Sequence, residues 1–135
     1  SLLGLLQYEP LPPSQSCTFY TETQVEIARR TEAILTADLR QHHPARELAA
    51  RFAVSETSLK NYFRGVFGQN LSVYLREVRM RRAAQLLASS QLPVSAVAEA
   101  VGYANQSKFA AVFRQAYRLS PLEYRRASRL GAEKT

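Results

Sequence analysis

An internal repeat with an offset of fifty residues is the feature that most constrains how this chain can fold. Six pairs of positions match at that one offset, and four of the pairs are identities: Leu59 with Phe109, Phe63 with Phe113, Arg64 with Arg114, Phe67 with Tyr117, Tyr74 with Tyr124 and Arg76 with Arg126. Upstream, Leu48-Ala49 matches Val97-Ala98 if the second turn has one extra residue. Such a repeat predicts two similar supersecondary units in one chain.

The hydrophobic spacing throughout the repeats is helical. We expect helices at about 23–41, 45–52, 56–67 and 71–89, then one opened by Pro93 and closed by Gly102, one capped by Asn105, and a short last one from Ser120-Pro121 through Tyr124. Thr23-x-x-Glu26 has the spacing of a capping box, Ser55 has the position of an N-cap, and Gly68 that of a left-handed helix terminator. Since few stretches alternate apolar and polar residues, the predicted fold class is all-α.

Each repeat unit consists of a short helix, a turn of a few residues and a second helix, which is the layout of a helix-turn-helix. The predicted units cover about 45–68 and 93–118, and a long linker helix at about 71–89 joins them. The aromatic residues on the predicted buried faces are Phe63, Phe67, Phe109, Phe113, Tyr74 and Tyr124.

The opposite faces of the two second helices are polar. They carry Thr57, Lys60, Asn61 and Arg64 in the first unit, and Gln106, Ser107, Lys108, Ala111 and Arg114 in the second. Short hydrogen-bonding side chains near a helix N-terminus suit contacts with base edges, whereas Arg and Lys suit phosphates.

The positive charge is concentrated in the repeats. The whole chain of 135 residues has 18 Lys and Arg against 11 Asp and Glu, a net charge of +7, but Arg46–Arg129 alone holds 14 basic and 5 acidic residues, a balance of +9. This excess is compatible with nucleic acid, an anionic membrane or an acidic protein as partner. The repeats lack the continuous basic amphipathic stripe of a membrane-binding helix, so we expect no membrane partner.

Signals of other functional classes are weak. The single cysteine, Cys17, cannot form an intramolecular disulfide, and His42-His43 lacks the spacing of a metal site. No phosphate loop, carboxylate pair or nucleophile motif is present, so we predict no enzyme, no cofactor and no metal. No apolar run is long enough to span a bilayer and no export signal is present, and we expect a cytoplasmic protein. An enzymatic alternative would make Cys17 an alkyl acceptor or a redox centre.

Three segments resemble the DNA-binding region of AraC/XylS-type transcriptional regulators. They are Val97–Arg114, Ser120–Arg125 and the linker Tyr74–Ala83, and the resemblance covers roughly Ala45–Arg126. It implies a sequence-specific regulator of transcription, an activator, that places two recognition helices in successive major-groove segments of double-stranded DNA. It also implies RNA polymerase as a partner and a separate domain, absent from this chain, for any effector ligand.

The resemblance also implies domain boundaries and roles for individual residues. We expect a DNA-binding domain at 21–130, preceded at 1–20 by a linker or the tail of a missing sensor domain. Carried over by position, base contacts fall to Thr57, Lys60, Asn61, Gln106, Ser107 and Lys108, and we assign phosphate contacts to Ser55, Arg64, Asn105 and Arg114.

Three positions depart from the family pattern. Ala111 stands where an arginine is frequent, which favours fewer direct base contacts and more reliance on phosphates and DNA shape in the second unit. Arg118 replaces a helix-terminating glycine, and Ala53 replaces a glycine of the first turn. An alternative hypothesis is a basic helical module whose main partner is a protein, such as polymerase or an antitermination complex.

Overall fold

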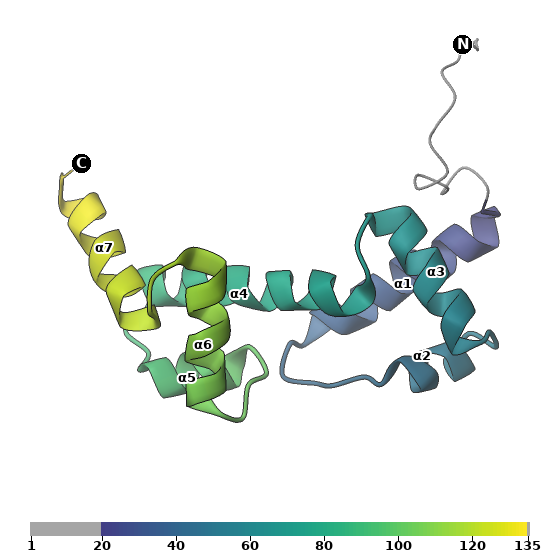
Figure 1. Cartoon of the computed structure of the whole chain (residues 1–135), viewed down its shortest axis with the longest axis horizontal. Helices are drawn as coiled ribbons and strands as arrows, with labels where there is room; N and C mark the ends of the chain where they lie inside the picture. Colours follow the sequence, from purple (N-terminus) through teal and green to yellow (C-terminus); the bar gives the residue numbers. More distant parts are fainter. Residues whose placement is uncertain (1–19, 135) are drawn as a thin grey trace, which may run out of the picture. The chain divides into compact units, whose positions relative to one another are not determined.

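The computed structural model describes residues 20–134, and within that range it contains seven α-helices and no strand (Figure 1). The helices are α1 (Glu22–Ala37), α2 (Ala45–Arg51), α3 (Glu56–Phe67), α4 (Leu71–Ser89), α5 (Val94–Ala100), α6 (Gln106–Tyr117) and α7 (Pro121–Lys134). The all-α prediction is confirmed. Cys17 and the predicted linker or tail, apart from Tyr20, lie outside the described residues.

The described chain divides into two compact units. The first consists of residues 20–32 and 44–71, and the second of residues 33–43 and 72–134. Each unit contains one helix-turn-helix, α2 with α3 in the first and α5 with α6 in the second. The units therefore correspond to the two halves of the sequence repeat.

In the first unit, α2 packs on α3 (Figure 1). Leu48 and Ala49 of α2 and Leu59 and Phe63 of α3 are buried. Burial of these apolar faces is what holds two short helices together, because isolated helices of this length are marginal in water.

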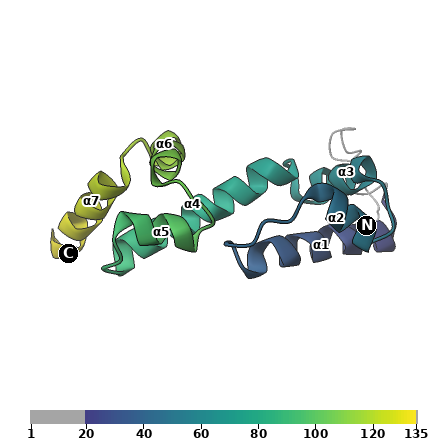
Figure 2. The ribbon, with the colours of Figure 1, turned by 90° about the horizontal axis from the view of Figure 1, so that it is seen from below.

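The second unit has a core formed by α4, α5 and α6. Its largest buried members are Phe109, Phe113, Leu87, Val97, Val101 and Met80, and Tyr117 and Tyr124 pack against them. Figure 2 shows α5 and α6 crossing steeply, as they also do in Figure 1. Ala83 and Ala84 of α4 are buried in the same cluster, and such small side chains let helices approach closely.

The two helix-turn-helix turns have the same backbone design. The Val54 amide donates to the Ala49 carbonyl at 3.0 Å, and the Tyr103 amide donates to the Ala98 carbonyl at 2.9 Å. Each turn also contains one left-handed residue, Ala53 at φ 58° in the first and Gly102 at φ 94° in the second. Alanine therefore occupies a conformation that favours glycine.

Two predictions for α1, its capping box and its C-terminal end, are wrong. The capping box is formed by Thr21 and Gln24, whose backbone amides each bond to the other's side chain, and not by Thr23 and Glu26. The helix ends at Ala37 rather than near residue 41. It ends early because the backbone beyond Ala37 is held by contacts with distant residues.

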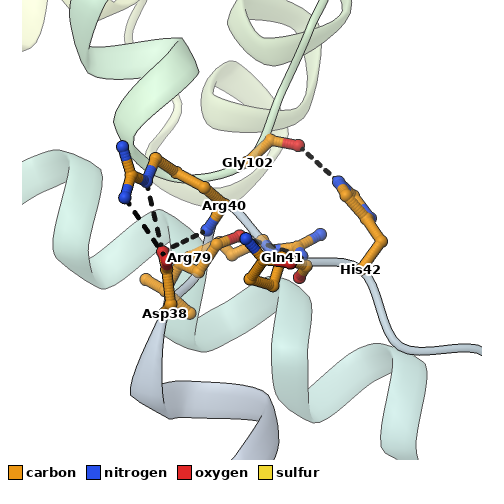
Figure 3. Close-up of polar contacts among 7 residues, drawn as sticks. Asp38, Arg40, Gln41, His42, Arg79 and Gly102 are labelled. Atoms are coloured by element: carbon orange, nitrogen blue, oxygen red, sulfur yellow. Dashed lines mark hydrogen bonds and ion pairs between the residues drawn. The ribbon is translucent and has the colours of Figure 1, made fainter.

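Those contacts hold the segment 38–43 against the second unit's own turn (Figure 3). The Arg79 guanidinium donates to the carbonyls of Leu39 at 3.1 Å and Gln41 at 3.4 Å, and His42 Nε2 donates to the Gly102 carbonyl at 3.0 Å. Asp38 accepts hydrogen bonds from the backbone amide and the side chain of Arg40, with which it forms an ion pair. These hydrogen bonds lower the pKa of the Asp38 carboxyl. These residues form what we call the Arg79 clasp: Asp38, Arg40, Gln41, His42, Arg79 and Gly102, with the Leu39 carbonyl.

Arg79 itself is only 9% exposed, so this member of the basic run on α4 has a structural role. Burial lowers the pKa of its guanidinium, but arginine stays protonated in proteins because its ordinary pKa is so high. Arg81 and Arg82, its neighbours in the run, are exposed.

The last helix is also longer than predicted, since α7 continues past Tyr124 to Lys134. Ser120 and Glu123 form a reciprocal capping box at its start, and these bonds lower the pKa of Glu123. Arg125 donates to the carbonyls of Leu87 and Ser90, and Arg129 donates to that of Ser90. These contacts add tertiary support to the second and third turns of α7.

Replacing Gly102 with alanine tests how tightly the clasp is packed. A Cβ at Gly102 would overlap the Leu39 carbonyl oxygen, whereas a Cβ at the left-handed Gly68 would meet nothing within 4 Å. We expect Gly68→Ala to cost about 1 kcal/mol of backbone strain. Gly102→Ala should exceed that loss by at least about 1 kcal/mol, because the overlap displaces Leu39 from Arg79. Chemical denaturation of both variants measures the difference, and equal losses would show that the clasp is loose.

Candidate nucleic-acid interface

Helix α3 has an exposed polar face, and buried apolar residues on its opposite face hold the helix in place. Ser55 Oγ accepts from the Ser58 amide at 3.0 Å and caps the helix, as predicted. Leu59 and Phe63 are fully buried on one side. The residues predicted to face DNA, Thr57, Lys60, Asn61 and Arg64, are all exposed.

An ion pair on α3 was not anticipated from the sequence. Lys60 Nζ lies 2.9 Å from a carboxylate oxygen of Glu56, one turn earlier. Both side chains are about half exposed, and a solvated pair of this kind contributes less than about 1 kcal/mol. Glu56 therefore orients Lys60 without preventing it from exchanging to another acceptor. The i,i+4 spacing of opposite charges was the signal available in the sequence.

Helix α6 repeats the arrangement of α3. Asn105 Oδ1 accepts from the Lys108 amide at 3.0 Å and caps the helix, while Phe109 and Phe113 are fully buried. The predicted outward-facing residues Gln106, Ser107, Lys108, Ala111 and Arg114 are all exposed. The structure thus brings the predicted residues of each unit together on one helix face.

The two capping residues also begin the exposed faces. Ser55 and Asn105 are themselves exposed, so the first turn of each helix is open to a ligand. Backbone amides and the positive end of the helix dipole favour an anion at this position. In Asn105 the cap uses the acceptor Oδ1 and does not require the amide hydrogens.

Both helices end on a left-handed residue. Gly68 has φ 77° and donates to the Arg64 carbonyl, and Arg118 has φ 66° and donates to the Arg114 carbonyl. The offset of fifty residues pairs Gly68 with Arg118, so α6 ends where the repeat places its end even though the terminator is an arginine.

Aromatic rings pack against one another on the buried face of α6. The Phe113 ring centroid lies 4.7 Å from that of Tyr117, 5.4 Å from Tyr124 and 5.8 Å from Phe109. Burial raises the pKa of the Tyr117 hydroxyl. Of the aromatic core predicted from the sequence, Phe63, Phe109 and Phe113 are fully buried, and Phe67, Tyr74 and Tyr124 are half-buried.

Residues 20–134 contain neither a metal-ligand cluster nor a membrane-spanning helix. No three His, Cys, Asp or Glu side chains gather there as metal ligands would. No helix in that range combines the length and apolar character needed to cross a membrane.

Comparison with known proteins identifies the architecture. A family model described as a helix-turn-helix domain matches residues 48–127. Similar curated proteins include the transcriptional regulator AlkR of Acinetobacter baylyi, 32% identical over 60% of this chain and 26% of the relative. The transcriptional activator RclR of Escherichia coli is 37% identical over 58% of this chain and 28% of the relative. The matched region thus spans about a quarter of these relatives.

Solved structures agree with the sequence matches. The DNA-binding domain of AdpA, crystallised with a target DNA, has a TM-score of 0.70 and 25% identity, covering 85% of this chain and all of that one. The C-terminal domain of AraT, a response regulator from Geobacillus stearothermophilus, has a TM-score of 0.66 and 31% identity, covering 77% of this chain and 84% of that one. With more than half of its length matched, the chain belongs to the AraC-type helix-turn-helix family, whose fold is that of DNA-binding transcription regulators.

Proposed function

We propose that the chain binds double-stranded DNA in a sequence-specific manner and regulates transcription by inserting α3 and α6 into successive major-groove segments. One observation carries this proposal. Each of the two helices is capped, buried on one face and exposed on the other, and the exposed face combines small polar side chains with basic ones. A helix with such a face fits the width of the major groove and its pattern of donors and acceptors.

Roles follow from side-chain chemistry and position. Thr57, Lys60 and Asn61 on α3, with Gln106, Ser107 and Lys108 on α6, contact base edges, because they lie in the first half of each helix. Ser55, Arg64, Asn105 and Arg114 contact phosphates, which positions the helices without discriminating among bases.

Relatives support a regulatory role for the whole protein. RclR is named as a transcriptional activator, and the AdpA domain was crystallised with a target DNA. We propose that this protein is likewise an activator, that residues 21–130 form its DNA-binding domain, and that RNA polymerase is a second partner. Since the relatives are about four times longer than the matched segment, any effector ligand would bind a region outside it.

Selection from a randomised duplex library tests the function. The proposal expects an asymmetric motif with two half-sites separated by about one helical turn. Retention of random duplexes with no enrichment would overturn it and would favour a basic module that binds mainly a protein.

Asn61→Ala tests base contacts in the first unit. The amide of Asn61 can pair with two groups on adenine, so its loss should cost about 1–3 kcal/mol at one or two base pairs. Affinities for single-base variants of the selected site, measured by fluorescence anisotropy, give the discrimination. An equal loss on specific and random duplexes would show that Asn61 does not contact a base.

Arg64→Ala tests phosphate contacts on the same helix. Because phosphates carry no base identity, we expect all sequences to be weakened alike. The slope of log affinity against log salt should fall in magnitude by about 0.9, because one fewer counterion is released. A loss restricted to the selected site would contradict the phosphate assignment.

Asn105→Asp separates capping from phosphate binding. Aspartate is as good an N-cap as asparagine, so the free energy of unfolding should change by less than about 0.5 kcal/mol. The variant loses the amide donors and gains a negative charge, so DNA affinity should fall on every sequence. Asn105→Ala is the companion variant, which should lose about 1 kcal/mol of stability. Unchanged affinity of Asn105→Asp would show that Asn105 is only a cap.

A further inference from the structure

Ala111 lies at the centre of the exposed face of α6. At 100° per residue it projects between Ser107, one turn before it, and Gln115, one turn after it, with Arg114 beside it. These four residues are all exposed, and the buried Phe109 and Phe113 lie on the other side of the helix. The middle of a polar, basic surface is therefore a single methyl group.

The equivalent position in the first unit is Asn61. The offset of fifty residues that relates the two units pairs Asn61 with Ala111 directly. Asn61 can donate and accept hydrogen bonds, whereas the side chain of Ala111 can do neither. The same position in the two units therefore suits chemically different base edges.

The surface at Ala111 is an open depression lined by Ala111, Val112, Arg114 and Gln115. Val112 is half-buried and Ala111 exposed, so the two together offer an apolar spot. Lys108, Arg114 and Arg118, the basic residues of α6 and its C-cap, are exposed along the same helix. This surface suits a ligand that brings a small apolar group flanked by negative charges.

The major groove of DNA has one such group. Among the four bases only thymine exposes a methyl, at C5, and small apolar side chains contact it there. The phosphates on either side of the groove supply the negative charges that complement the basic residues. Building on the proposed DNA-binding function, we propose that Ala111 is a specificity-determining residue that contacts the 5-methyl group of one thymine in the half-site bound by α6.

The size of the effect follows from the buried surface. Removing one buried carbon of the CH₂ type costs about 0.8 kcal/mol. At 1.4 kcal/mol per tenfold change, this is about a fourfold difference in affinity. A difference of that size is resolved by competition binding.

Deoxyuridine substitution tests the contact. The full chain of 135 residues is bound to the selected duplex, and each thymine is replaced in turn by deoxyuridine, which lacks only the methyl. We expect about a fourfold loss at one thymine in the half-site whose base discrimination is lost in Gln106→Ala. In Ala111→Gly, the thymine and uracil duplexes should bind equally at that position, and losses at other thymines should be unchanged.

The matched control is Ala116→Gly. Ala116 is an exposed alanine of the same helix that points away from the face of Ala111, so glycine there imposes a similar helix-propensity cost. Because thymine and uracil duplexes are compared within each variant, a general loss of α6 stability cancels. The control should keep the fourfold discrimination.

Two results would overturn the proposal. One is a wild-type chain that binds thymine and uracil duplexes equally throughout the half-site of α6. The other is a methyl effect that persists in Ala111→Gly, which would assign the contact to another residue. In both cases an enriched asymmetric motif in the selection would leave the proposed function intact, whereas absence of any motif would remove both.

Discussion

Burial of one face of α3 and of one face of α6 is the constraint on which the rest of the structure depends. A helix of twelve residues, such as α3 or α6, is too short to be stable in water by itself. In α6, Phe113 has no exposed surface and contacts three other aromatic rings, which fixes both the position of the helix and its rotation about its axis. The exposed side chains of α6 keep one orientation because the buried side chains fix the rotation of the helix.

The same scaffold carries two different outward faces. Caps, turn hydrogen bonds and left-handed C-caps recur in both units, so these features belong to the fold. The outward positions differ: α3 has Asn61 and a Lys60 held by Glu56, while α6 has Ala111 and no acidic residue. Two units with one backbone design but different faces can contact different base sequences, which is what an asymmetric site on DNA requires.

Local signals in the sequence were sufficient for most elements. The boundaries of α3 and α4 match the prediction, because Ser55, Gly68 and the helical spacing all act within a few residues. The end of α1 and the length of α7 were wrong for a common reason. Arg79 captures the carbonyls of Leu39 and Gln41, and Arg125 captures those of Leu87 and Ser90, across 35 or more residues of sequence. No local pattern marks an arginine as the partner of a distant backbone carbonyl. The polar face of α6 could be predicted because the apolar residues on the opposite face recur at helical spacing.

The same hydrogen bonds reduce the number of basic side chains that are available for phosphate contacts. The balance of +9 in Arg46–Arg129 suggests many phosphate contacts, yet donors of Arg79, Arg125 and Arg129 are engaged by carbonyl oxygens of the protein. In the proposed complex these guanidinium groups would still add to the positive field around the DNA, but the engaged donors cannot also bond to phosphate oxygens. The number of counterions released on DNA binding should therefore depend on the exposed basic residues whose donors are not engaged within the fold, and not on the total charge. Net charge is only compatible with a nucleic acid as partner, and the hydrogen bonds of each arginine decide whether its donors are available to phosphates or are used within the fold.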